Sequence, residues 1–148
     1  MRKSLWNPES RKELTARLDR LEPSASPRWG RMTAPRMLAH LTDWMLMASG
    51  DLPTAPRYSI LRKAPVRYLA IYWLPFPKGV PTAKELITRE PSEWAVELSA
   101  FRQHLQSFEI MDPNRIWPEH PAFGFITPET WGVLGYRHTD HHLRQFGV

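Results

Sequence analysis

Histidine residues cluster near the C-terminal end of the chain. Three of the six histidines fall within the run His138-Thr139-Asp140-His141-His142. On a helix, residues four apart lie about 40° apart around the axis and one turn apart along it, so His138 and His142 can converge on one ion. His138 with His141 is a second possible pair. Periodicity favours His142, which lies nearer to the apolar stripe of its segment.

A metal site needs at least one more ligand than this pair provides. His40 is the other histidine that falls within an apolar helical stripe. Three neutral imidazoles that leave open positions are typical of catalytic sites for zinc, nickel or another divalent metal ion. Asp43 and Asp140 are candidate acceptors that would orient an imidazole. The alternative is that His40 is a core histidine, that 138–142 is a polar helix end and that both acids are ordinary solvated residues.

The rest of the sequence offers no obvious nucleophile. Cysteine is absent, which excludes thiolate metal sites and cysteine catalysis, and a metal must therefore be held by nitrogen and oxygen. No glycine-rich phosphate loop, glycosidase carboxylate pair or GxSxG motif is found. His120 precedes a proline in the loop 117–124, where we expect it to stabilise a turn, with a functional role as the alternative.

Four segments with helical periodicity position these residues. The first begins at Asn7-Pro8 and ends before Pro23, and the second has Thr33 as its N-cap and ends at Gly50. The third begins near Ser92 and extends to Phe108, and the fourth begins at Thr127 and extends to about Phe146. In three of them, a capping side chain followed by proline in the first turn marks the start.

A connector of some forty residues with seven prolines, from Pro53 to Pro91, separates the second and third segments. Part of it, from Ile60 to Leu74, is apolar enough for a helix that Pro65 kinks or splits. Strand signals are weak. The sequence therefore predicts one all-α domain over residues 1–148, a four-helix bundle with a long crossover between its second and third helices.

Positive charge is concentrated in this connector. The formal net charge is +5, and residues 52–84 contain six basic residues and no acidic one: Arg57, Arg62, Lys63, Arg67, Lys78 and Lys84. A basic, aromatic-rich segment can contact nucleic acid, an acidic membrane or an anionic substrate, or can be a solvated connector. The alternative function is thus a non-catalytic binding module. No signal peptide or transmembrane run is apparent, and we expect a cytoplasmic protein.

Two stretches resemble the DinB-like (YfiT-like) superfamily of metal-binding four-helix bundles, and more closely a small branch of it. They are Arg28-Trp29-Gly30-Arg31-Met32-Thr33 leading to Met37-Leu38-Ala39-His40-Leu41, and His120-Pro121-Ala122-Phe123-Gly124 leading to Trp131 and the segment 138–147. The resemblance covers most of the chain. It matches His40, His138 and His142 to the metal histidines of the superfamily and makes His141 a neighbour.

The resemblance also implies partners and chemistry. It implies a homodimer, a pocket beside the metal and a small-molecule substrate. Relatives include transferases and isomerases that use low-molecular-weight thiols, and proposed hydrolases. The expected function is a metal-dependent enzyme that activates either a thiol cofactor, as an S-transferase, or a water, as a hydrolase. Its general acid or base is not identified by the sequence.

Overall fold

The computed structural model describes residues 2–79 and 82–148, and every regular element within them is helical. The elements in order are α1 (Pro8–Leu18), α2 (Ala34–Ser49), η1 (Ile60–Arg62), α3 (Ala64–Tyr72), η2 (Lys84–Leu86), α4 (Trp94–Ser107) and α5 (Pro128–Gln145), where η denotes a short 3-10 helix. The predicted all-α class is confirmed. Pro81 of the expected connector lies outside the described residues.

The helix starts follow the capping signals of the sequence. Asn7 accepts hydrogen bonds from the backbone amides of Glu9 and Ser10, while Thr33 and Thr127 each cap one of the two longest helices, α2 and α5. Gly50 ends α2 in the left-handed conformation, with φ of 87°, which glycine adopts without strain. These predicted boundaries are confirmed to within a residue or two.

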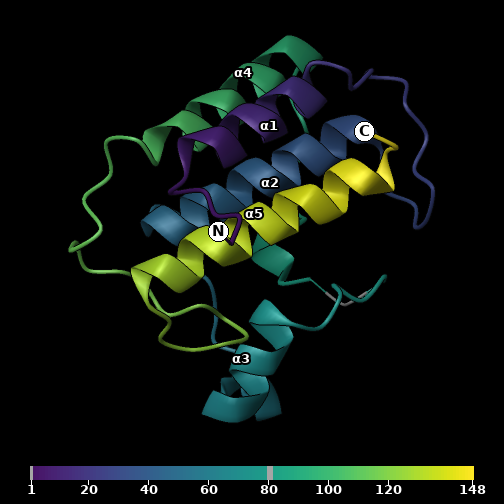
Figure 1. Ribbon diagram of the computed structural model, residues 1–148. Coiled ribbons are helices and arrows are strands. Elements are labelled where there is room, and N and C mark those ends of the chain that lie inside the picture. The colour runs from purple at the N-terminus through teal and green to yellow at the C-terminus, as the bar shows by residue number, and fades with distance from the viewer. Residues whose placement is uncertain (1, 80–81) are drawn as a thin grey trace.

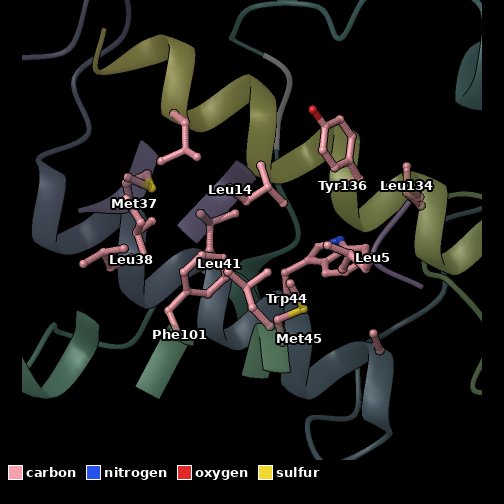
Figure 2. Close-up of a cluster of buried hydrophobic side chains, with 14 of the residues drawn as sticks. Leu5, Leu14, Met37, Leu38, Leu41, Trp44, Met45, Phe101, Leu134 and Tyr136 are labelled. Carbon is pink, nitrogen blue, oxygen red and sulfur yellow. The ribbon is translucent and has the colours of Figure 1, made fainter. Parts of the chain in front are cut away.

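The helices α1, α2, α4 and α5 lie side by side, and each of them contacts two of the others (Figure 1). Specifically, α2 packs on α4 and α5, and α1 packs on the same two helices. Their inward faces form one apolar core, part of which Figure 2 shows, with fully buried side chains such as Leu14, Leu38 and Phe101. Helix α3 projects from this group and contacts α5 and η1.

Two glycines of α5 let the N-terminal segment lie close against that helix. A Cβ atom at Gly135 would lie 2.5 Å from Leu5 Cδ1, and a Cβ atom at Gly132 would overlap Trp6. The close approach allows Leu5 N to donate a hydrogen bond to Gly132 O at 2.9 Å. Glycine therefore serves here for packing, despite its low helix propensity.

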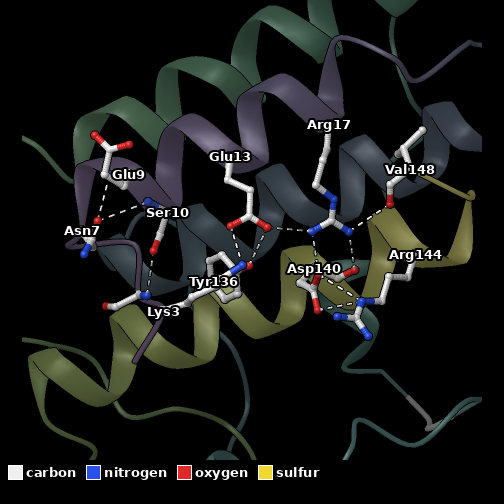
Figure 3. A network of polar contacts seen from close by, with 11 residues as sticks. Lys3, Asn7, Glu9, Ser10, Glu13, Arg17, Tyr136, Asp140, Arg144 and Val148 are labelled. Atoms are coloured by element: carbon white, nitrogen blue, oxygen red, sulfur yellow. Dashed lines mark hydrogen bonds and ion pairs between the residues drawn. The ribbon is translucent and has the colours of Figure 1, made fainter. Parts of the chain in front are cut away.

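Polar contacts hold α1 against the outer face of α5 (Figure 3). Arg17 forms an ion pair with Asp140 at 2.6 Å and donates a hydrogen bond to the carbonyl of Val148. Tyr136 donates to Glu13, which also pairs with Lys3. These contacts tie α1 to the face of α5 that carries residues 136, 140 and 144, which lies opposite the face that carries His138 and His142.

The connector between α2 and α4 contains η1, α3 and η2. Pro65 lies in the first turn of α3. The apolar stretch from Ile60 to Leu74, which the sequence predicted to be either kinked or split by this proline, is split into η1 and α3. Arg137 of α5 hydrogen bonds to the carbonyls of Ala70, Ile71 and Leu74, which fastens the C-terminal end of α3 to α5. Within the described residues, no helix is long and apolar enough to cross a membrane.

Candidate metal centre

Three histidines from two helices converge beneath the connector. His40 comes from α2, and His138 and His142 come from successive turns of α5. His138 Nε2 lies 3.0 Å from His40 Nε2 and 3.2 Å from His142 Nε2, and three ligand atoms, one from each histidine, lie within 4.8 Å of one another. The structure thus brings together the three histidines that the sequence singled out.

The outer ring nitrogens of two of these histidines have acceptors. His40 Nδ1 lies 3.0 Å from the carbonyl oxygen of Leu86, in η2, and His142 Nδ1 lies 2.8 Å from Gln145 Oε1. The amide of Gln145 is itself oriented, because its Nε2 donates to the carbonyl of Trp29 at 2.9 Å. Both Nδ1 atoms must therefore carry the proton, which leaves the Nε2 lone pairs of His40 and His142 facing His138.

This arrangement fits a bound cation. His138 Nε2 can donate a proton to only one of the two lone pairs that face it, and His138 Nδ1 is buried without a hydrogen-bond partner among the described residues. A cation among the three Nε2 atoms would satisfy all of them. Tetrahedral zinc with nitrogen ligands at about 2.0–2.1 Å separates those nitrogens by about 3.3 Å, close to the two short distances seen here.

Burial keeps the imidazoles in the neutral form that metal binding requires. Desolvation lowers the pKa of His142 to about 3 and lowers the pKa of His138 well below its ordinary value. The pKa of His40 is lowered for the same reason, although its hydrogen bond to Leu86 opposes the shift. At neutral pH all three rings are therefore uncharged, so a metal ion does not have to displace the extra proton of an imidazolium.

A cavity of about 530 Å³ adjoins the histidines. The connector and the loop before α5 supply much of its wall, and all three histidines line it. The remaining lining is largely apolar and includes Trp44, Leu61, Leu74, Phe76 and Leu86. The volume exceeds what an ion requires and is that of a small-molecule site.

His141 lies beside the cluster, with its ring 5.2 Å from that of His142, centroid to centroid, but is not one of the three converging residues. Its ring lies 5.4 Å from the Trp29 ring and 5.7 Å from the Phe76 ring, centroid to centroid, and it lines the cavity. The alternative pairing of His138 with His141 is not the one that the structure brings together with His40.

The two acids considered as partners of the histidines are engaged elsewhere. Asp43 forms an ion pair with Arg89 at 2.9 Å, and Asp140 pairs with Arg17 and Arg144. The acceptors that orient the imidazoles are instead Leu86 O and Gln145 Oε1. The periodicity of the last helix allows either Gln145 or Phe146 on its inward stripe, whereas no sequence pattern marks a backbone carbonyl such as that of Leu86.

His120 combines the two roles considered for it. Its Nδ1 accepts hydrogen bonds from the amides of Ala122 and Phe123, at 3.2 and 3.3 Å, and its backbone pairs with Gly124. It therefore stabilises the turn, as expected. The same contacts place the ring proton on Nε2, which has no acceptor among the described residues, and the residue lines the cavity. His120 is thus a neutral donor available to a bound molecule.

The arginines of the basic segment 52–84 contact the loop that contains His120. Arg62 pairs with Glu119 at 2.7 Å and donates to the carbonyl of Pro121, and Arg67 donates to the carbonyls of Phe123 and Phe125. Apolar side chains of the same segment are exposed, among them Tyr58 and Trp73. Part of the positive charge therefore holds the connector on the cavity wall.

No family model, curated protein or solved structure matches the chain. The resemblance to the DinB-like superfamily consequently rests on the sequence motifs, and the chemistry of the site rests on the geometry of its side chains.

Proposed function

We propose that the protein is a metal-dependent enzyme acting on small molecules, with His40, His138 and His142 as the ligands of one divalent ion. The observation that carries this proposal is the convergence of three Nε2 atoms at the wall of a cavity large enough for a substrate, with outer acceptors that set the lone pairs of His40 and His142. A divalent ion in such a site lowers the pKa of a water or thiol at its remaining positions and so supplies a nucleophile near neutral pH.

The protein's own residues would prepare the site in three ways. Gln145 and Leu86 O hold two ligands in one tautomer and orientation, which reduces the reorganisation that metal binding needs. The apolar wall, including Trp44 and Phe76, excludes water from around the bound molecule. His120 would donate its Nε2 proton in a hydrogen bond to a substrate oxygen.

We also propose that the protein belongs to the DinB-like superfamily and has that superfamily's four-helix bundle fold. The cyclic packing of α1, α4, α2 and α5 and the long connector between α2 and α4 support a DinB-like four-helix bundle with a crossover. On the same resemblance we propose zinc or nickel as the ion, a homodimer, and either thiol transfer or hydrolysis as the reaction. The alternative, that segment 52–84 binds nucleic acid or an acidic membrane, has less support because Arg62 and Arg67 are engaged within the chain.

Metal content tests the proposal. Untagged protein, analysed for elements after purification, should hold about one divalent ion per chain, and zinc, nickel or manganese should raise the melting temperature of EDTA-treated protein because a ligand of the native state stabilises it. His138→Ala should abolish both effects. His141→Ala is the matched control, since it removes a neighbouring imidazole of the same helix and should leave the metal content unchanged.

Two outcomes would contradict the proposal. Full metal content in His138→Ala would exclude this ligand set, and an absence of both metal and thermal shift in the wild-type protein would exclude a metal enzyme. With metal confirmed, thiol transfer and hydrolysis can be compared on the same small substrates, each with His138→Ala as the inactive reference.

A further inference from the structure

The charges around the cavity are of one sign. Arg31 and Arg57 line it, and Lys78 lies between two lining residues, with its Nζ 4.5 Å from the centre of the Trp29 ring. We call Arg31 and Lys78 the cationic rim; both are exposed. None of the lining residues in the described part of the chain is an aspartate or a glutamate.

Two acids next to residues of the site are balanced by arginines outside the rim, and a third, Glu85, accepts a hydrogen bond from the amide of Ala55. Asp43, one turn after His40, pairs with Arg89, and Glu119, next to His120, pairs with Arg62. Each of them is thus balanced by an arginine that is not part of the rim. The rim therefore keeps its positive potential, and cavities with apolar walls concentrate such a field.

The ligand set adds to the same imbalance. Three neutral imidazoles contribute no negative charge, so a divalent ion bound by them would keep its full charge of +2 at the cavity wall. Sites that include a carboxylate ligand would offset part of it. A ligand that brings its own negative charge would neutralise both the ion and the rim.

The wall between these charges is suited to an apolar body. Trp44, Leu61, Leu74 and Phe76 line the cavity, which at about 530 Å³ has room for one or two rings or a short chain. The hydrogen-bond donors in the wall include the Nε2 of His120, which requires an acceptor and is matched by an oxygen of an anionic group.

We infer that the cavity binds a small organic anion, with its apolar body against the aromatic wall and its charged group drawn to the cationic rim and the metal centre. This inference rests on the proposed function, because it assigns a substrate class to the same site. It would hold for the rim and the wall even in the absence of the ion.

A matched pair of fluorescent probes tests the inference. 8-Anilinonaphthalene-1-sulfonate and N-phenyl-1-naphthylamine share one ring system, differ in the sulfonate, and both gain fluorescence in an apolar site. Titrated into the full-length protein, with zinc and after EDTA treatment, the anion should bind at least about tenfold more tightly than the neutral probe, a difference of about 1.4 kcal/mol. Zinc should widen the difference.

Variants locate the binding. The double variant Arg31→Gln/Lys78→Gln should remove most of the preference for the anion and leave the affinity of the neutral probe unchanged, whereas Lys63→Gln, an exposed lysine of the same basic segment outside the cavity, should change neither. Ala70→Trp, which fills part of the cavity, should weaken both probes. Trp73→Ser, at an exposed position directly after α3 and outside the cavity lining, should weaken neither.

The outcomes separate this inference from the proposed function. Equal affinity of the two probes would overturn the inference. So would a loss of anion preference in Lys63→Gln as large as that in Arg31→Gln/Lys78→Gln. Loss of probe binding in Trp73→Ser, with binding intact in Ala70→Trp, would place the probes outside the cavity and would also overturn it. Metal content measured on the same preparations reports on the function alone. A protein without metal that still prefers the anion would refute the proposed function and support the anion site.

Discussion

Gln145 connects the proposed metal centre to the loop after α1. Its Oε1 accepts from His142 Nδ1, its Nε2 donates to the carbonyl of Trp29, and its own carbonyl accepts from the amide of Arg28 at 2.6 Å. It is buried, so no water replaces these contacts at low cost. The orientation of one ligand therefore depends on a side chain that touches no metal.

We expect Gln145→Leu to weaken zinc binding by about 10–100-fold, because His142 would lose the acceptor that selects its tautomer. Competition with a chromophoric chelator measures the affinity. Asp140→Asn is the matched control: this acid lies between the histidines in sequence yet contacts Arg17 and Arg144, so its loss should leave zinc affinity unchanged. The reverse pattern would show that Asp140 orients the site.

At this scale the sequence predicted the cluster well and its surroundings poorly. Spacing and periodicity placed His138 and His142 on one face of a helix and selected His40, because those signals come from the side chains themselves. Leu86 O could not be predicted, since every residue has a carbonyl and only the tertiary fold brings this one to His40. The free Nε2–H of His120 follows from hydrogen bonds within a turn that spacing does not reveal.

Among the elements, the end of the connector is fastened to α2 and α4 by one arginine. Arg89 donates to Asp43 of α2 and to both carboxylate oxygens of Glu97 of α4. The two acids are almost fully buried, with exposed fractions of 4% and 2%. The hydrogen bond from Arg89 lowers the pKa of Glu97 and thereby keeps this carboxylate charged. The same contacts hold the chain just after η2, which supplies Leu86 O to His40.

We expect Arg89→Met to lower the free energy of unfolding by about 3 kcal/mol, because it leaves two buried carboxylates without a counter-charge. Chemical denaturation at pH 7 measures the loss. Arg36→Met serves as the control, since the ion pair of Arg36 with Glu90 is exposed and should contribute less than about 1 kcal/mol. Equal effects of the two variants would mean that burial does not govern the Arg89 cluster.

Helix positions were predictable from local chemistry, and the course of the connector was not. The sequence shows where three helices begin, at Asn7, Thr33 and Thr127, because a capping side chain accepts a hydrogen bond from a backbone amide only two or three residues further along the chain. The connector is held by contacts between residues far apart in sequence, such as Arg67 with Phe123 O and Arg137 with Ile71 O near the end of α3. Composition allows a nucleic-acid or membrane surface here because it does not show that Arg62 and Arg67 are engaged by Glu119 and by backbone carbonyls of the chain.

Across the whole molecule, neutral buried histidines make stability depend on pH. Burial lowers the pKa of His120 to about 3 in the folded state, against about 6.5 in the unfolded chain. Between these values unfolding takes up a proton, so acid favours the unfolded state. The contribution is fully present above pH 6.5 and is lost as the pH falls toward 3. Lowered glutamate pKa values, such as that of Glu97, act only below about pH 4.5.

Between pH 6.5 and 4.5 the pH dependence of stability therefore comes from the histidines and not from the glutamates. The variant His120→Asn removes the contribution of one histidine. The Oδ1 atom of asparagine can take the place of His120 Nδ1 as acceptor for the amides of Ala122 and Phe123, so the turn is kept while the titrating ring is removed. In the presence of EDTA, the free energy of unfolding should fall as the pH is lowered through this window, and it should fall more steeply for the wild-type protein than for the variant. The difference in slope should be about 1.4 kcal/mol per pH unit. Urea denaturation at half-unit steps of pH gives both curves. Parallel curves would mean that His120 takes up its proton in the folded state, and hence that the cavity wall is open to water at that ring.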